Sequence, residues 1–233
     1  AIFSALIDEE DSPFQDALER VSDETVFSLP LIIAPKKYQD QIIEQCDFID
    51  LWYEDLLLVE EEASLLDIMR TASAWMEKRR QTAPLLFCPL PYFIADQFAF
   101  LRAVQDAAYS AQHGYFLAFG CVHTHVLVQH HYLEVGMRIE AGFGGHHIKA
   151  WTQKDDITAL EAVVSDAPYV QNTNFYCVNS KELSHYLSLQ DDQSHQCFEK
   201  FFMGYEKRAV ISFLSACADL RHWCGVWDAL RLS

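Results

Sequence analysis

The chain has 233 residues, with 17 Lys and Arg against 34 Asp and Glu and a formal charge of −17. Such an acidic chain excludes nucleic acid as a partner, because a surface that follows phosphates needs clustered Lys and Arg. With 51% hydrophobic and 22% charged residues, it has the composition of a folded globular protein. No apolar stretch approaches the roughly 20 residues that span a bilayer. We expect one domain over residues 1–233, cytoplasmic and without membrane insertion.

The first half of the chain alternates short apolar runs with amphipathic helical patterns. Strand-length apolar runs separated by helices favour an α/β fold with a mostly parallel central sheet and helices on both faces. The expected helices cover residues 12–22, 65–79 and 96–111, with one more through Tyr38, Ile42 and Ile43. The expected strands cover residues 1–7, 29–34, 55–59, 84–88 and 115–122.

The second half is less regular and predicts a smaller, β-rich portion. An aromatic-rich stretch at residues 198–205 is open to two interpretations, part of a dimer surface or part of the core. The expected helices cover residues 157–164 and 180–189, and the expected strands cover residues 132–139, 148–152 and 174–178.

Seven short segments follow one another in a recognisable order. They are residues 30–34 with 38–45 (PLIIA, YQDQIIEQ), 119–124 (FGCVHT), 132–136 (YLEVG), 151–156 (WTQKDD), 169–175 (YVQNTNF), 205–207 (YEK) and 225–230 (GVWDAL). This order resembles the nucleotidyltransferase domain of bacterial mannose-1-phosphate guanylyltransferases, enzymes that join a sugar 1-phosphate to GTP and release pyrophosphate.

The resemblance implies a Rossmann-like nucleotide-diphospho-sugar transferase fold. About residues 1–122 would form the nucleotide-side half, and about residues 123–233 the sugar-side half with the carboxy-terminal elements. Because the chain ends at Ser233, we also expect it to lack the isomerase domain that some relatives carry.

The resemblance places the family's chemical positions on side chains of the wrong kind. Nucleotidyl transfer needs a backbone cradle for the triphosphate and carboxylates that hold Mg²⁺. Residues 8–11, all carboxylates, stand where the family has its glycine-rich phosphate loop, and the first glycine is Gly114. The family's two metal-binding carboxylates fall on Pro91 and Trp223, which cannot ligate a cation. Of the family's sugar-facing set, Glu134, Lys154, Asn172 and Thr173 remain. Two interpretations are open for these four: they hold a hexose hydroxyl or a phosphate, or they are framework residues.

We therefore expect a catalytically degenerate pseudoenzyme with no catalytic residue and no cofactor. It would act as a protein-binding or sugar-nucleotide-sensing module in polysaccharide or nucleotide-sugar metabolism. Its expected partners are a second copy of the chain or an active nucleotidyltransferase, and a sugar nucleotide. The alternative is an active, Mg²⁺-dependent guanylyltransferase in which substitute carboxylates replace the lost ones, with Asp96, Asp155 and Asp156 as candidates.

Histidines support a second alternative, a metal-binding protein. Six of them lie within residues 121–147, which begin with Cys121, and a His-x-His spacing on a strand directs both rings to one face. Imidazole ligates zinc, nickel and copper. The spacings match no structural zinc motif, so surface or hydrogen-bonded imidazoles remain the competing interpretation. The candidate ligands are His123, His125, His130 and His131.

Overall fold

The computed structural model describes residue 3 and residues 12–90, 92–94, 96–121, 130–140, 144–153, 156–165, 168–189, 197–213 and 217–219. The helices among these residues are α1 (Pro13–Glu19), η1 (Lys36–Tyr38, 3₁₀), α2 (Gln39–Phe48), α3 (Leu65–Lys78), α4 (Gln97–Gln112), α5 (Ile157–Ser165), α6 (Ser180–Leu189) and α7 (Phe198–Gly204). The strands are β1 (Leu31–Pro35), β2 (Asp55–Val59), β3 (Pro84–Phe87), β4 (Tyr92–Ile94), β5 (Phe116–Cys121), β6 (Tyr132–Arg138), β7 (Gly145–Thr152), β8 (Tyr169–Asn179), β9 (Arg208–Phe213) and β10 (Cys217–Asp219).

Six strands form the main sheet, in the order β3-β8-β5-β9-β7-β6. Strand β6 also pairs with β8, so five of these strands close into a barrel-like ring. Within this sheet only the β5–β9 pairing is parallel, and the five other pairings are antiparallel. The expectation of a mostly parallel central sheet is therefore wrong for the described strands. Alternating strands and helices suggested parallel crossovers, but β8 runs back between β3 and β5.

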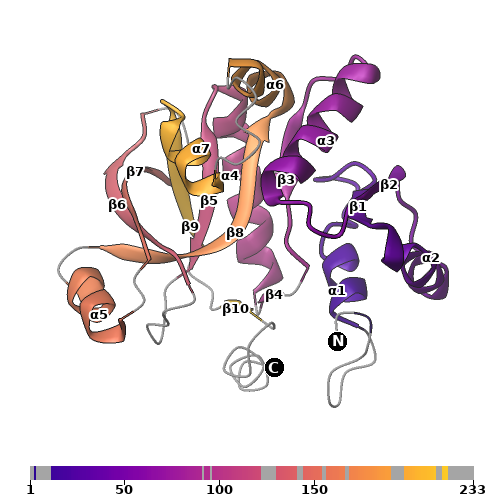
Figure 1. Cartoon of the computed structure of the whole chain (residues 1–233), viewed down its shortest axis with the longest axis horizontal. Coiled ribbons are helices and arrows are strands. Elements are labelled where there is room, and N and C mark those ends of the chain that lie inside the picture. Colours follow the sequence, from indigo (N-terminus) through magenta and orange to yellow (C-terminus); the bar gives the residue numbers. More distant parts are fainter. Residues whose placement is uncertain are drawn as a thin grey trace.

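Helices cover both faces of this sheet, as the sequence predicts (Figure 1). Alternate residues of the wholly buried β5 belong to two different core clusters. Leu117 and Phe119 pack in the cluster that includes α4, whereas Phe116 and Ala118 pack in the cluster that includes α3, α6 and α7. This alternation follows from the two-residue period of a strand.

Phe116 is the centre of an aromatic cluster on the α7 face. Its ring lies 4.9 Å from that of Phe202, centroid to centroid, and 6.3 Å from that of Phe201, both edge-on. Phe201 and Phe202 are fully buried, so these two rings of the stretch at residues 198–205 belong to the core. The dimer-surface interpretation of that stretch is therefore wrong for these two rings.

A smaller layer contains α1, α2 and the parallel pair β1–β2, at one side of the main sheet in Figure 1. It has a core of its own around Phe14 and Ile42. The helix α1 begins with a complete capping box, in which Ser12 and Gln15 each satisfy the other's backbone N–H. At its other end the Arg20 guanidinium donates to the Tyr92 carbonyl over 2.9 Å, which ties the layer to β4.

Most of the predicted elements are present within about two residues of their expected bounds. The strand expected at residues 1–7 lies outside the described residues apart from Phe3. No helix in the described ranges combines the length and apolar character needed to cross a bilayer.

Candidate functional site

Strand β8 carries two of the expected sugar-facing residues, at a bulge. Opposite β8, Ala118 pairs with Tyr176 while Gly120 pairs with Asn172, so residues 173–175 together face the single residue Phe119. The bulge interrupts the ladder at Phe119. The Thr173 hydroxyl donates to the Phe119 carbonyl over 2.8 Å and restores the missing hydrogen bond. Thr173 is fully buried, so its hydroxyl serves the framework.

Asn172 lies beside the bulge, and its side-chain amide is fully used. Its Nδ2 donates to the Tyr176 hydroxyl over 2.8 Å and to Asn174 Oδ1 over 3.3 Å. Its Oδ1 accepts from the Asn174 backbone N–H over 3.1 Å. Burial raises the pKa of the Tyr176 phenol, although the hydrogen bond from Asn172 lowers it, so the phenol stays neutral and its own O–H donates to Asn174.

Asn174 is a residue that the sequence pattern did not single out. Its φ is +61°, in the left-handed region. Glycine adopts that region freely, and Asn does so more readily than other residues with a side chain. The Asn174 side chain accepts hydrogen bonds from Asn172 and Tyr176. The signal in the sequence was the tolerance of Asn for left-handed backbone.

Glu134 on β6 is also engaged within the sheet. Its Oε1 lies 3.4 Å from Lys149 Nζ on β7, and its Oε2 accepts from the Tyr169 hydroxyl over 3.4 Å. Lys149 is largely exposed, so this ion pair contributes little to stability. The carboxylate is nevertheless held across three strands, β6, β7 and β8.

The sheet does not direct Glu134 and Asn172 to one face. Glu134 pairs with Tyr169 and therefore shares its face, and Gln171 follows on that face two residues later. Asn172 is the next residue and points to the opposite face. The fourth expected sugar-facing residue, Lys154, lies outside the described residues.

Two of the candidate metal ligands, His130 and His131, are hydrogen-bonded through Nδ1. The Trp151 indole donates to His131 Nδ1 over 2.9 Å, and Gln171 Nε2 lies 3.1 Å from Nδ1 of the buried His130. These contacts match the interpretation of hydrogen-bonded imidazoles for this pair. His123 and His125 lie outside the described residues, so the four-histidine cluster stays a prediction. The described residues contain no group of three or more His, Cys, Asp and Glu side chains arranged to hold a metal ion.

The substitute carboxylates of the enzyme alternative have structural partners where they are described. Asp96 accepts from the Ala99 N–H over 2.8 Å and caps α4. Asp156 accepts from the Ala159 N–H over 2.8 Å at the start of α5. Both contacts are typical N-caps. Asp155, Pro91 and Trp223 lie outside the described residues.

Solved structures share this fold almost over its whole length. A Thermus thermophilus protein named as a mannose-1-phosphate geranyltransferase matches with a TM-score of 0.71 and 14% identity, over 94% of this chain and 69% of that one. A Helicobacter pylori mannose-6-phosphate isomerase matches with a TM-score of 0.73 and 15% identity, over 94% of both chains. A glucose-1-phosphate thymidylyltransferase from Bacillus anthracis matches with a TM-score of 0.68 and 8% identity, over 95% of this chain and 82% of that one. The fold is that of the sugar-phosphate nucleotidyltransferases.

The sequence is similar to mannose-1-phosphate guanylyltransferase. The Sinorhizobium fredii protein of that name is 25% identical over 175 residues, which make up 75% of this chain and 34% of the relative. The xanthan biosynthesis protein XanB of Xanthomonas campestris is 22% identical over 147 residues, 63% of this chain and 31% of that protein. The chain thus spans about a third of the length of these relatives. No protein-family model matches it.

Proposed function

We propose that this chain is a non-catalytic relative of the sugar-phosphate nucleotidyltransferases that binds a partner protein or a sugar nucleotide. The partner would be a second copy of the chain or an active nucleotidyltransferase. The setting would be polysaccharide or nucleotide-sugar metabolism, which agrees with the xanthan role in the name of one relative.

One observation carries the proposal: the described sugar-facing side chains are engaged with the chain itself. Asn172 uses both its Nδ2 hydrogens and its Oδ1 within β8, and Thr173 holds the Phe119 carbonyl. A ligand would have to displace these buried contacts, and breaking each costs about 1 kcal/mol or more. Binding through Asn172 and Thr173 is therefore disfavoured, which leaves Glu134 and Lys154 as the polar contacts of a weak sugar-nucleotide site.

The chemistry of the metal positions supports the same proposal. Neither the Pro91 nor the Trp223 side chain offers an oxygen, whereas Mg²⁺ takes oxygen ligands in near-octahedral geometry. This donor set does not fit the ion. The capping box fixes the start of α1 at Ser12 and Pro13. If residues 1–7 form the expected strand, only residues 8–11, all carboxylates, remain for a phosphate loop before that helix.

A direct test measures pyrophosphate release from GTP and mannose 1-phosphate with Mg²⁺, beside an active guanylyltransferase as positive control. We expect release no faster than in a protein-free blank. Isothermal titration calorimetry with GDP-mannose, with and without Mg²⁺, then tests sensing, and we expect any binding to be independent of the metal.

Turnover above the blank would contradict the proposal and favour the active enzyme. Metal-dependent binding of GTP would do the same, because it requires carboxylates that Pro91 and Trp223 do not supply. If calorimetry detects no binding of any nucleotide or sugar phosphate, the result would favour a protein-binding role over a sensing role.

A further inference from the structure

Exposed apolar side chains gather on the smaller layer, whose α2 and β2 lie on the side away from the main sheet (Figure 1). Ten large apolar side chains are exposed in the described part of the chain, and five of them lie within residues 29–58. Four of these five belong to α2, to β2 or to the loop that joins them. They are Ile43, Phe48, Trp52 and Leu58, and we refer to them as the α2–β2 patch. Apolar side chains that gather on a surface mark sites of contact with another molecule.

The local structure directs the patch residues outward. Leu51 and Tyr53 pack against the core around Phe14 and Ile42, so Trp52 between them points away from that core. Its side chain is 74% exposed, and that of Phe48 at the end of α2 is 78% exposed. Neither ring therefore contributes much to the packing of the layer.

Strand β2 leaves a sheet edge open beside the patch. Among the described strands, β1 is the one that pairs with β2. Within this pair Ala34 of β1 is 7% exposed, whereas its partner Leu58 on β2 is 40% exposed. An exposed edge is commonly protected by Lys, Pro or a bulge. The segment Asp55–Val59 contains neither residue type, and its pairing with β1 has no register shift.

The open edge can accept another extended segment through backbone hydrogen bonds. The Leu56 N–H already donates to Asp55 Oδ1 over 3.0 Å, so we expect this pairing to run from Leu57 to Val59. So short a pairing needs side-chain contacts as well, and the α2–β2 patch supplies apolar ones.

The charge around the patch indicates which segment fits. Residues 39–62 contain nine Asp and Glu and no Lys, Arg or His. Lys37 pairs with Glu61, and Arg79 lies 3.5 Å from Asp55 and 3.9 Å from Glu54. The other six carboxylates are exposed and form no ion pair with a described residue; they are Asp40, Glu44, Asp47, Asp50, Glu60 and Glu62. Such a surface is complementary to a cationic partner.

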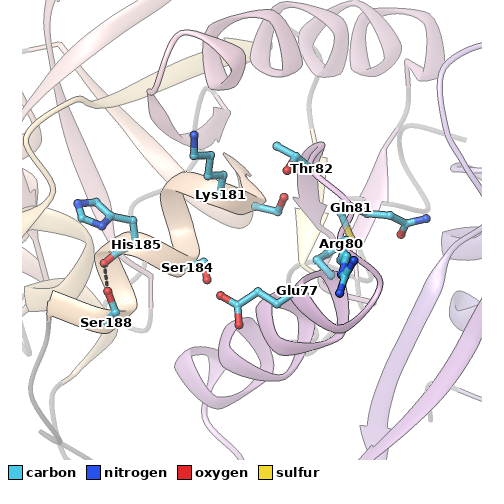
Figure 2. A pocket seen from close by; sticks show the side chains of 10 residues that line it. Glu77, Arg80, Gln81, Thr82, Lys181, Ser184, His185 and Ser188 are labelled. Carbon is cyan, nitrogen blue, oxygen red and sulfur yellow. Dashed lines mark hydrogen bonds between the residues drawn. The ribbon is translucent and has the colours of Figure 1, made fainter.

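The open pocket between α3 and α6 is not part of this surface. Figure 2 shows that the Glu77 carboxylate points into the pocket, whereas the Lys181 ammonium is directed away from Arg80. Its cations do not converge on one point, so the pocket does not form an anion site. Arg80 lines this pocket together with α6 and so does not neutralise the carboxylates around the patch.

We propose that the α2–β2 patch docks a basic, amphipathic segment of a partner protein, which adds a strand to the edge of β2. The apolar side chains of that segment cover Leu58 and Trp52, and its Lys or Arg side chains meet carboxylates such as Glu60. The inference rests on the protein-binding form of the proposed function and adds the chemistry of the partner.

A second copy of this chain does not fit the patch. Pairing of two β2 edges would bring the acidic residues 39–62 of both copies together. Like charges that face each other across paired strands are destabilising, and they suppress wrong partners at interfaces. The charge therefore selects a different, cationic chain.

The experiment titrates the whole chain with a short fluorescein-labelled peptide of alternating Lys and Val, followed by fluorescence anisotropy. We expect saturable binding that weakens as salt is added, because exposed charges are screened. The absence of saturable binding would overturn the proposal.

Two further peptides separate charge from strand pairing. A peptide of alternating Lys and Ser keeps the charge but lacks the apolar side chains, and a Lys–Val peptide with a methylated backbone lacks the N–H donors. We expect each to bind about tenfold more weakly. Equal binding of the Lys–Ser peptide would reduce the site to its charge, and equal binding of the methylated peptide would exclude strand pairing; either result overturns the proposal.

Variants of the chain locate the site. Leu58→Lys and Trp52→Ala should each weaken binding of the Lys–Val peptide about tenfold, as expected at the centre of an interface. Trp52→Ala replaces a mostly exposed side chain, so it keeps the test valid if Leu58→Lys disturbs the strand. The matched controls are Phe98→Ala and Glu206→Gln, exposed residues outside the patch, and we expect no change in either. Unchanged binding in both patch variants, or an equal loss in the controls, would contradict the proposed site.

Sedimentation of the chain alone tests the competing occupant. A dimer that Leu58→Lys dissociates would overturn the proposal, because the patch would then bind a second copy. The peptide titration does not depend on nucleotide turnover. Pyrophosphate release would contradict the proposed function and leave the titration unaffected, whereas a failed titration leaves sugar-nucleotide binding as a form of the proposed function.

Discussion

The indole of Trp151 donates a hydrogen bond to Nδ1 of His131 over 2.9 Å, and this contact joins β7 to the residue that precedes β6. It places the His131 proton on Nε2, because Nδ1 is the acceptor. The same indole packs on Phe202, 5.9 Å away between ring centroids. Trp151 thus serves both the aromatic core and a polar contact at its border.

Trp151→Phe separates these two roles. The ring can still pack on Phe202, but the N–H donor is lost, so we expect a loss of about 1 to 2 kcal/mol in the free energy of unfolding. Urea denaturation followed by circular dichroism measures it. Trp52→Phe is the control, because Trp52 is 74% exposed and its replacement should change stability by less than about 0.5 kcal/mol. Equal effects of the two variants would show that the hydrogen bond contributes nothing.

Asn174 predicts different outcomes for two small replacements. Both Asn174→Gly and Asn174→Ala lose the contacts to Asn172 and Tyr176, but only alanine suffers the steric cost of a φ of +61°. We expect the alanine variant to be about 1 kcal/mol less stable than the glycine variant by thermal and urea unfolding. Equal stability of the two would contradict a left-handed backbone at this position.

Phe116 should be among the most sensitive positions in the chain. Its ring is fully buried and contacts rings from β8 and α7. Phe116→Ala leaves a cavity that these rigid rings cannot fill, and we expect a loss of about 3 to 5 kcal/mol in urea denaturation. Phe98→Ala is the matched control, since Phe98 is 72% exposed and its loss should have little effect. A small effect at Phe116 would contradict the aromatic cluster.

Ser64→Ala predicts a pH-dependent loss of stability. Ser64 caps α3, and its hydroxyl and N–H lower the pKa of Asp67 below 3.8. A carboxylate with a lowered folded-state pKa contributes stability above the unfolded value, and this contribution disappears as the pH falls through the folded value. We expect a cost of about 1 kcal/mol at pH 7.

The same cost should narrow as the pH falls below 3.8 and through the lowered pKa of Asp67, where the carboxylate becomes protonated in both proteins. Urea midpoints of the wild type and of Ser64→Ala, compared at pH 7 and across this acid range, provide the measurement. A gap that stays constant would show that the serine acts without Asp67.

The helices were the most predictable part of the fold. Periodic apolar positions and capping residues mark helix starts locally, and the helix expected from residue 12 is indeed capped by Ser12. Ser64 caps α3 in the same way. Strand positions were also accessible, and the strand at residues 55–59 agrees to the residue. These signals need no knowledge of distant residues.

Strand direction and the polar contacts of the site could not be predicted from the sequence in the same way. The antiparallel run of β8 depends on a partner far earlier in the chain, where Pro84 pairs with Asn179. The engagement of Asn172 by Asn174 depends on a bulge, which is a mismatch between two strands and not a property of one of them. The resemblance therefore located these residues, but it could not show the hydrogen bonds that they make within the sheet.

The pairing of β3 with β8 also limits when β3 can form hydrogen bonds during synthesis of the chain. In the described sheet, β8 is the one strand that pairs with β3, so these hydrogen bonds cannot form until residues 169–179 have left the ribosome. Residues 88–168 emerge in between, while an apolar edge strand stays unpaired. A nascent chain released before that point would expose β3 to other chains, and the halves on either side of residue 122 would not fold separately.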